Sequence, residues 1–428
     1  MTLINHLRNF GLSIVLIIAL ISSALALDPN VQDLVDYETR SNAVARRSND
    51  QVQIEHYEIP LELVGQDIAD RMDPNIKKAL IFKKNGTDYV RWVINPEDTQ
   101  WHLEVKDFLE SKGLSSQKHT HLLGSMTASR SYIIEDPATG AQFSLKVSTN
   151  KTGGYWKNKK QPIKDAEEIR TIADFVYEQQ QIRPFEHLIT MDEPGIFKLE
   201  AIDQAMVIRT LDGLVGTDKI YLPGFSAVHG ETGKKIARLN GSNDPEKYWR
   251  ENYNKPLARA LAELAARAGL SYDSPHSQNF LIELDSNLKP TGRIVVRDFG
   301  DSYLCEDIFK AKGRAEITAN WTPKYIKRGT LKVSIGIMHG NTYPTWLSDE
   351  QYDVWGDEYF EEHKKEFSKQ TGIPVARLDA DYFLNNTYYS GKYKIQGRAW
   401  ETFLENVKTE ADEYRSNPRR LNCRFIIE

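Results

Sequence analysis

The sequence has 428 residues, of which 40% are hydrophobic and 27% are charged, so it holds enough apolar material for a globular core. Its 55 basic and 60 acidic residues give a net charge of −5, which argues against a nucleic-acid protein that binds through a basic face. The two cysteines, Cys305 and Cys423, exclude a disulfide scaffold and a zinc cluster of three or four thiolates.

The N-terminal residues are typical of a signal peptide. A short polar start precedes a mostly apolar run, Gly11 to Leu27, which contains the small-x-small motif Ala24-Leu25-Ala26. We predict cleavage after Ala26 and a secreted or periplasmic protein. An uncleaved anchor is the alternative, because the run is near the lower limit for a membrane span. After cleavage no membrane contact is expected, and export would allow Cys305 and Cys423 to pair.

The predicted fold is α+β, with two lobes. Residues 1–26 are the signal peptide, and the polar segment 27–55 is expected to be a flexible lead-in. The N-terminal lobe is predicted to span residues 56–210. The C-terminal lobe spans residues 211–428 and ends in a mostly helical, aromatic-rich region.

The predicted elements of the first lobe include a strand near Tyr89–Ile94 and a helix near Leu103–Ser111. Two β-rich runs, Ser131–Asp136 and Ala141–Ser148, flank Pro137-Ala-Thr-Gly140 and predict a hairpin that carries Lys146 on its second strand. Pro162 then introduces a helix with apolar residues at helical spacing. A strand is expected at Gln204–Arg209.

The clearest pattern of the second lobe is a predicted helix. It begins at Pro256, has one apolar stripe and ends at Gly269. Two strands follow, Phe280–Leu284 and Arg293–Val296. Asn279 comes directly before the first strand, and Asp298 comes shortly after the second. Antiparallel pairing of the two strands would therefore bring these residues together.

An Asn oxygen and an Asp carboxylate are hard ligands that suit Mg²⁺, which keeps water and nucleotide phosphate as further partners. Protein kinases build their metal site in a similar way, with an Asn and the Asp of Asp-Phe-Gly. Lys146 would then hold phosphate oxygens, and Glu167, Glu168 or Glu178 on the next helix can pair with it. The alternative is a hairpin in which Asn279 and Asp298 only cap turns.

Several segments resemble the siderophore synthetases that work independently of peptide synthetases, the aerobactin-synthetase type. They are Tyr248-Trp-Arg250, the helix from Pro256 to Leu270, His276-Ser-Gln-Asn279 and Arg297-Asp-Phe-Gly300. Upstream, Thr127–Ser131, Phe143–Asn150 and Ala205–Arg209 are similar to further motifs of that family. The resemblance covers residues 120–305 and implies a kinase-like palm.

The resemblance implies that ATP and Mg²⁺ bind between these segments. Arg130, Ser131 and Lys146 would contact phosphate, and Arg209 on the central strand would also bind the nucleotide. His276 and Asn279 would face the nucleotide, while Asp298, with Asn279, would hold Mg²⁺. Lys146, His276 and Asp298 are the candidate catalytic residues.

The implied reaction is attack of a carboxylate on the α-phosphate of ATP, which gives an acyl-adenylate that an amine or alcohol captures. The sequence departs from the family at Ser274-Pro275, where Glu-Ala is usual, and lacks an Arg after Thr149-Asn150. Two alternatives therefore stay open: a secreted kinase-like phosphotransferase and a non-catalytic nucleotide-binding module of the same fold. The partner is a small-molecule or protein substrate that the sequence does not identify, and no nucleic acid is expected.

Overall fold

The computed structural model describes residues 27–39, 50–127, 130–151, 158–211, 213–228, 231–272, 277–300, 302–334, 348–385, 388–394 and 397–416. The predicted signal peptide, 1–26, lies outside these ranges. Within them, no helix combines the length and the apolar character needed to cross a bilayer. The fold is a mixture of helices and sheets, as expected for the α+β class.

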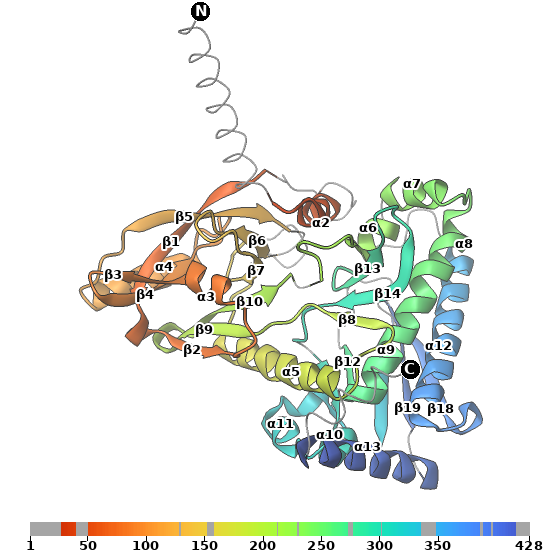
Figure 1. The fold of residues 1–428 in the computed structure, drawn as a ribbon. Coiled ribbons are helices and arrows are strands. Elements are labelled where there is room, and N and C mark those ends of the chain that lie inside the picture. Colours follow the sequence, from red (N-terminus) through yellow and green to blue (C-terminus); the bar gives the residue numbers. More distant parts are fainter. Residues whose placement is uncertain are drawn as a thin grey trace, which may run out of the picture.

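The largest sheet of the described residues has nine antiparallel strands in the order β2-β9-β10-β7-β6-β5-β1-β4-β3 (Figure 1). The strands are β1 (Val52–Pro60), β2 (Gly65–Ile68), β3 (Ile81–Lys84), β4 (Thr87–Val93), β5 (Lys118–Met126), β6 (Ser131–Glu135), β7 (Gln142–Lys146), β9 (Gly195–Leu199) and β10 (Gln204–Thr210). Helices α3 (Pro74–Leu80) and α4 (Trp101–Ser111) contribute apolar side chains to the core of this sheet.

Strand β10 is buried along its whole length. All seven of its residues are buried, because both faces of the strand are covered. Ala205 and Val207 pack with helix α5 (Ile163–Ile182), whereas Met206 and Ile208 point into the core on the opposite face. Side chains alternate along a strand, so the polar Arg209 lies on the α5 face.

A second sheet has the order β11-β13-β14-β8 and consists of β8 (Leu188–Thr190), β11 (Ile220–Pro223), β13 (Phe280–Leu284) and β14 (Pro290–Val296). The hairpin of β13 and β14 confirms the two predicted strands, and its register places Phe280 opposite Val296. The backbone N–H of Arg297 donates to the carbonyl of Asn279 over 3.1 Å. The residues that follow β14 therefore lie beside those that precede β13.

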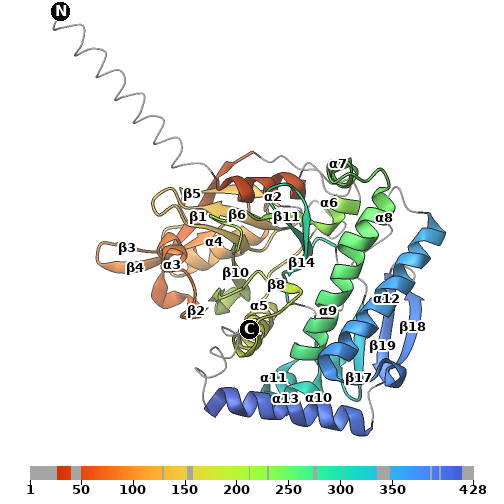
Figure 2. The same cartoon turned by 45° about the vertical axis from the view of Figure 1, so that its right-hand side comes forward.

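Helix α9 (Lys255–Ala268) is the centre of the second core, and it begins and ends as predicted. Pro256 lies in its first turn, and Gly269 ends it in the left-handed conformation, at φ 65°. Helix α12 (Asp349–Thr371) runs alongside it in both views (Figures 1 and 2). Apolar side chains of both helices join one cluster with those of β13 and β14.

The remaining elements surround this core. Strands β12 (Leu270–Tyr272), β15 (Ser302–Cys305) and β16 (Ile326–Lys327) form one small sheet, and β17 (Thr330–Ser334), β18 (Asp379–Asn385) and β19 (Tyr388–Lys394) form another. The helices are α6 (Gly224–Val228), α7 (Glu231–Leu239), α8 (Pro245–Trp249), α10 (Glu306–Ala311), α11 (Ala315–Asn320) and α13 (Arg398–Ser416). The C-terminal region therefore contains a three-stranded sheet besides the predicted helices.

The expectation of a flexible lead-in is wrong for part of that segment. Helix α2 (Pro29–Thr39) buries Val31, Leu34 and Val35 against side chains of β11, β13 and β14. These residues follow the i, i+3, i+4 spacing of an amphipathic helix, but a single short stripe in a polar segment is a weak signal. The predicted lobe boundaries stay predictions.

Candidate functional site

Lys146 and Asp298 come from the two large sheets and meet in an ion pair. Lys146 ends β7, and Asp298 lies two residues after β14. The Lys146 Nζ donates to the Asp298 Oδ1 over 2.8 Å. The lysine side chain is 10% exposed and the aspartate side chain 28%, so the carboxylate remains accessible from solvent. The structure thus brings together two residues that are 152 positions apart in the sequence.

Strand register places three of the predicted residues on one face of the nine-stranded sheet. Lys146 lies opposite Ser131 on β6 and opposite Val207 on β10, and Arg209 lies opposite Ser144. Because paired residues share a face and side chains alternate along a strand, Ser131, Lys146 and Arg209 all lie on the face that α5 covers. The Gly300 backbone, close to Ile169 of α5 and to Asp298, borders the same region.

A buried carboxylate, Glu193, completes the charge cluster. Its Oε1 accepts a hydrogen bond of 2.6 Å from Arg209, and its Oε2 accepts one of 3.4 Å from the backbone N–H of Phe299. Burial raises the pKa of Glu193, and the nearby Asp298 charge adds to this, although Arg209 opposes the rise. Glu193 carries no distinctive signal in the sequence, because an acidic residue before Pro194 is typical of a loop.

The electrostatics of the cluster keep Asp298 ionised. Burial alone would raise the pKa of this carboxyl group, but the Lys146 ammonium and the Arg209 guanidinium hold the pKa far below its ordinary value. Arg130 acts in the same direction. Asp298 also adopts a left-handed backbone conformation, with φ 65°, which few residues other than Gly, Asn and Asp take readily.

Arg209 and Arg130 supply further donors next to this cluster. The Nε of Arg209 is buried and makes no hydrogen bond within the described residues, although its NH2 is bound to Glu193. The NH1 of Arg130 donates to the Lys160 carbonyl over 2.8 Å. A buried donor without a partner is costly, so an anionic ligand at this point would recover that energy.

Arg297 fixes the segment that precedes Asn279. Its Nε and NH2 donate to the Gln278 carbonyl over 3.1 and 2.7 Å, and its NH1 donates to Glu38 of α2 over 2.5 Å. Asn279 is partly buried between this contact and β13. His276, the third candidate catalytic residue, lies outside the described residues, as do its neighbours 273–275.

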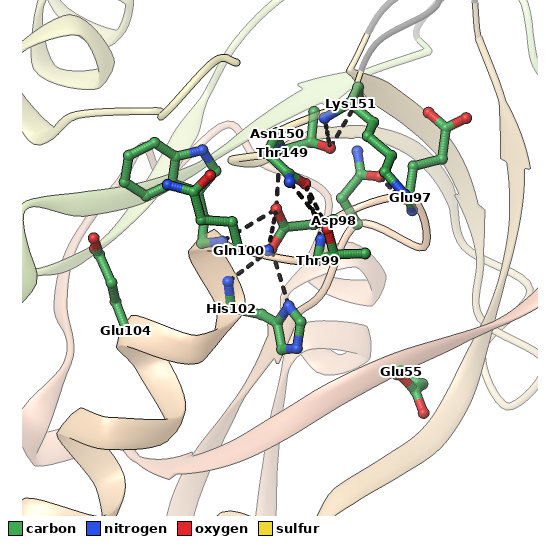
Figure 3. A network of polar contacts seen from close by, with 12 residues as sticks. Glu55, Glu97, Asp98, Thr99, Gln100, His102, Glu104, Thr149, Asn150 and Lys151 are labelled. Atoms are coloured by element: carbon green, nitrogen blue, oxygen red, sulfur yellow. Dashed lines mark hydrogen bonds and ion pairs between the residues drawn. The ribbon is translucent and has the colours of Figure 1, made fainter. Parts of the chain in front are cut away.

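A second polar network anchors the Thr149–Lys151 segment that follows β7 (Figure 3). The Asp98 carboxylate, 1% exposed, accepts hydrogen bonds from the backbone N–H groups of Trp101 (3.2 Å), His102 (2.7 Å) and Asn150 (3.1 Å). It therefore caps the first turn of α4 and holds Asn150 at the same time. The Asn150 side chain returns a contact by accepting from the Thr99 N–H over 2.9 Å.

The loop of residues 95–100, which includes Asp98, also contacts the Arg130 segment. The Nδ2 of Asn95 donates to the Arg130 carbonyl over 3.1 Å, and its Oδ1 accepts from the N–H of Glu97. Asn95 thus fixes the Arg130 segment, which the family resemblance assigns to phosphate binding, and Asp98 fixes the Thr149–Lys151 segment that follows β7. This support is not predictable from the sequence, because it depends on the tertiary position of a loop.

One part of the predicted site is wrong. Glu167, Glu168 and Glu178 do not pair with Lys146, because α5 directs them elsewhere. Glu167 binds Lys198 at 2.7 Å, Glu178 binds Arg314, and Glu168 accepts from Thr322 at 3.3 Å. Asp298 takes the place that a helix glutamate was expected to fill.

Among the two cysteines, only Cys305 is within the described residues. It is 2% exposed, and burial raises the pKa of its thiol to about 12, so it is a poor nucleophile. Cys423 lies outside the described residues, and the pairing of the two cysteines stays a prediction.

The chemistry of the donor set fits a hard cation next to an anion. An ionised, accessible carboxylate on Asp298 and an amide on Asn279 are oxygen ligands of the kind that Mg²⁺ accepts alongside water and phosphate. Lys146, Arg209 and Arg130 are cations that suit phosphate oxygens.

Solved structures with a similar fold are known, although the sequence itself has no match. Neither the protein-family models nor the curated proteins gave a match to the sequence. Among solved structures, the aerobactin synthetase IucA from a hypervirulent pathotype of Klebsiella pneumoniae is 11% identical, with a TM-score of 0.50 over 75% of this chain and 62% of that one. Its ATP-bound form is 12% identical, with a TM-score of 0.50 over 76% of this chain and 63% of that one.

The aerobactin synthetase IucC from the same pathotype is 13% identical, with a TM-score of 0.48 over 89% of this chain and 64% of that one. This chain thus spans less than two thirds of the length of each of these synthetases. The likeness to IucA extends over three quarters of the chain, further than the predicted residues 120–305. At these identities it concerns the fold, and the resemblance seen in the motifs is confirmed at that level. The chain has the fold of the aerobactin synthetases.

Proposed function

We propose that this chain is an ATP- and Mg²⁺-dependent ligase of the siderophore-synthetase type. It activates a carboxylate as an acyl-adenylate and condenses the acyl group with an amine or an alcohol. The observation that carries this proposal is the meeting of Lys146, Arg209 and Asp298 beside the end of the β13–β14 hairpin. The fold shared with an ATP-bound aerobactin synthetase supports the choice of nucleotide.

In this proposal the substrate carboxylate attacks the α-phosphorus of ATP, and pyrophosphate leaves with the electron pair of the broken P–O bond. Lys146 and Arg130 hold oxygens of the phosphates and stabilise the charge that develops on the leaving group. The buried Arg209 Nε–H, which has no hydrogen-bond partner within the described residues, would gain an acceptor from a phosphate oxygen. Asp298 and Asn279 would hold Mg²⁺, which supplies further neutralisation of phosphate charge.

In the second half-reaction the amine or alcohol attacks the acyl carbon, and AMP leaves. The nucleophile must lose a proton at this stage. His276 is the proposed acceptor of that proton, because an imidazole changes its protonation state near neutral pH.

The test is to incubate the purified protein with ATP, Mg²⁺, hydroxylamine and a panel of carboxylic acids, and to resolve the nucleotides and hydroxamates formed. We expect AMP, pyrophosphate and a hydroxamate, because hydroxylamine captures an acyl-adenylate. ADP would instead favour the phosphotransferase. Thermal stabilisation by ATP without any product would favour the binding module, and the absence of both effects would reject the nucleotide site.

The variant Asp298→Asn is the sharpest control for this test. Asn tolerates the left-handed φ of 65°, so the substitution removes the charge without straining the backbone as Ala would. Asp203→Asn is its matched control, since Asp203 is also left-handed, at φ 49°, and caps α5 through the Ile163 N–H. Product formation should fall at least a hundredfold in the first variant and stay unchanged in the second.

Export stays a proposal of its own. The predicted cleavage after Ala26 gives a mature chain that begins at Leu27. N-terminal sequencing of the protein recovered from its source cells tests it, and an N-terminus at Met1 would contradict it.

A further inference from the structure

Three potential metal ligands meet at a place that the proposed ligase reaction does not use. Glu186 and His187 lie in the turn between α5 and β8, and Glu366 lies on α12. Their ligand atoms are all within 4.8 Å of one another. We infer that these three side chains form a binding site for a divalent transition-metal ion of the Zn²⁺ type.

The geometry of the three side chains is close to that of a coordinated ion. The His187 Nε2 lies 3.7 Å from the Glu186 Oε1 and 3.5 Å from the Glu366 Oε1. Two ligands of a tetrahedral ion with bonds of about 2.0 Å are about 3.3 Å apart. The two His187 separations therefore need only small adjustments, and the two carboxylate oxygens, which lie within 4.8 Å of each other, would move to the same spacing. The same Nε2 is buried and meets both carboxylates at ion-pair distance, without a hydrogen bond of good geometry in the described part of the chain, so a metal ion would give it a closer partner.

The backbone that carries Glu186 and His187 is already fixed. The Glu263 carboxylate of α9 accepts hydrogen bonds from both of their N–H groups, over 2.7 and 2.8 Å. Arg267, one turn further along α9, donates to the Pro184 carbonyl over 3.0 Å. Preorganisation of this kind lowers the cost of bringing ligands together.

The third proposed ligand, Glu366, is also held in place by a hydrogen bond. Gln370 lies one turn beyond Glu366 on α12 and donates to its Oε1 over 2.7 Å. Contacts that orient a metal-binding carboxylate contribute to metal affinity. The set of one imidazole and two carboxylates suits Zn²⁺ and similar ions better than Ca²⁺, which prefers oxygen ligands alone.

An entry path and room for water are present beside the site. A cavity of about 450 Å³ opens there, and it is lined by Arg183, Pro184, Glu186, Glu263, Lys369 and Gln370. The Glu186 side chain is 60% exposed, so the ion would keep an open position on this side. Three protein ligands and one water form a common four-coordinate arrangement.

Lys369 lies against two of the three proposed ligands and would compete with a bound cation. Its Nζ lies 3.1 Å from the Glu186 Oε2 and 3.6 Å from the Glu366 Oε1. The lysine side chain is 56% exposed, so it can move into solvent when an ion binds. An ammonium group that competes with the metal lowers the apparent affinity, and this gives the inference a distinctive test.

The experiment is calorimetric titration of ZnCl₂ into the purified, untagged protein, repeated with the variants His187→Gln, Glu186→Gln, Glu366→Gln and Lys369→Met. We expect one bound ion in the unmodified protein and at least a tenfold loss of affinity in each ligand variant. Lys369→Met should bind severalfold more tightly, because the competing ammonium is gone. Circular dichroism confirms folding, and Glu186→Gln, an exposed substitution, keeps the test valid if a buried variant misfolds.

Asp298→Asn is the control for location, since it changes the proposed nucleotide site and should bind Zn²⁺ as the unmodified protein does. Absence of binding in the unmodified protein overturns the inference. Binding that survives His187→Gln and Glu186→Gln unchanged also overturns it, because the ion would then lie elsewhere.

Discussion

At the residue scale, Arg209 and Glu193 form a buried ion pair, and loss of one partner should lower the free energy of unfolding. Arg209→Met would leave the Glu193 carboxylate without its cation, at a position where it is fully buried. Removing one partner of a buried pair typically costs about 3–5 kcal/mol of unfolding free energy. Urea denaturation of the variant should show a loss of this size.

A double variant provides the control for this prediction. In Arg209→Met/Glu193→Leu neither charge remains, and replacement of a buried pair by apolar groups is often nearly neutral. We therefore expect the double variant to recover most of the lost stability. If the double variant is less stable than Arg209→Met, the two side chains do not act as a pair.

Residues of the candidate site differ in how well the sequence predicts them. The places of Lys146 and Asp298 in the chain's two hairpins were predictable from the β-rich runs and their turns, whereas the ion pair between them was not. Glu193 and Glu38 were not, since their roles depend on contacts with residues far away in the sequence. A buried carboxylate looks the same in sequence as an exposed one.

At the element scale, an ion pair of helix α2 links the N-terminal segment to the candidate site. Glu38 binds Arg297, which also holds the Gln278 carbonyl next to Asn279. Glu38→Gln should therefore lower the unfolding free energy by about 1.5–3 kcal/mol, the usual contribution of a hydrogen bond to a charged group. Urea denaturation measures this loss, and it does not depend on the proposed function.

The same variant should weaken the binding of ATP with Mg²⁺, because the segment that carries Asn279 loses its anchor. Thermal-shift titration measures the effect. Asp33→Asn, on the same helix but outside this contact, is the matched control and should leave the affinity unchanged. Equal affinities in both variants would show that α2 does not support the site.

Elements with strong local signals were predicted well. The α5 and α9 helices, the β6–β7 hairpin and the strands β13 and β14 all lie where proline, glycine and apolar spacing indicated. The missed elements, α2 and the C-terminal three-stranded sheet, have short apolar patterns that become stable only through packing.

At the scale of the whole molecule, two buried histidines make stability depend on pH. Burial lowers the pKa of His56 to about 4, with a smaller contribution from Arg91, and burial lowers the pKa of His363 to about 3. In the unfolded chain both would protonate below a pKa of about 6.5. Between these values the unfolded state binds more protons, so acidification destabilises the folded state.

Each histidine should contribute about 1.4 kcal/mol of lost unfolding free energy per pH unit below 6.5, until the pH reaches its folded-state pKa. Urea denaturation at pH 7 and pH 5 measures the sum over all groups. The variants His56→Gln and His363→Asn isolate the contribution of each histidine. Each variant should lose less unfolding free energy on acidification than the unmodified protein. An unchanged pH dependence would mean that the histidine already protonates in the folded state.

The ion pair between Lys146 and Asp298 has a consequence for the order in which ligands enter. It joins the nine-stranded sheet to the β13–β14 hairpin, so each partner is neutralised before any ligand arrives. A free cation would have to displace Lys146, and a free anion would have to draw Lys146 away and leave Asp298 uncompensated. An anion and a cation that arrive as one complex replace both partners at once. In the proposed nucleotide site, this ion pair would therefore favour a preassembled metal–anion complex over either component alone.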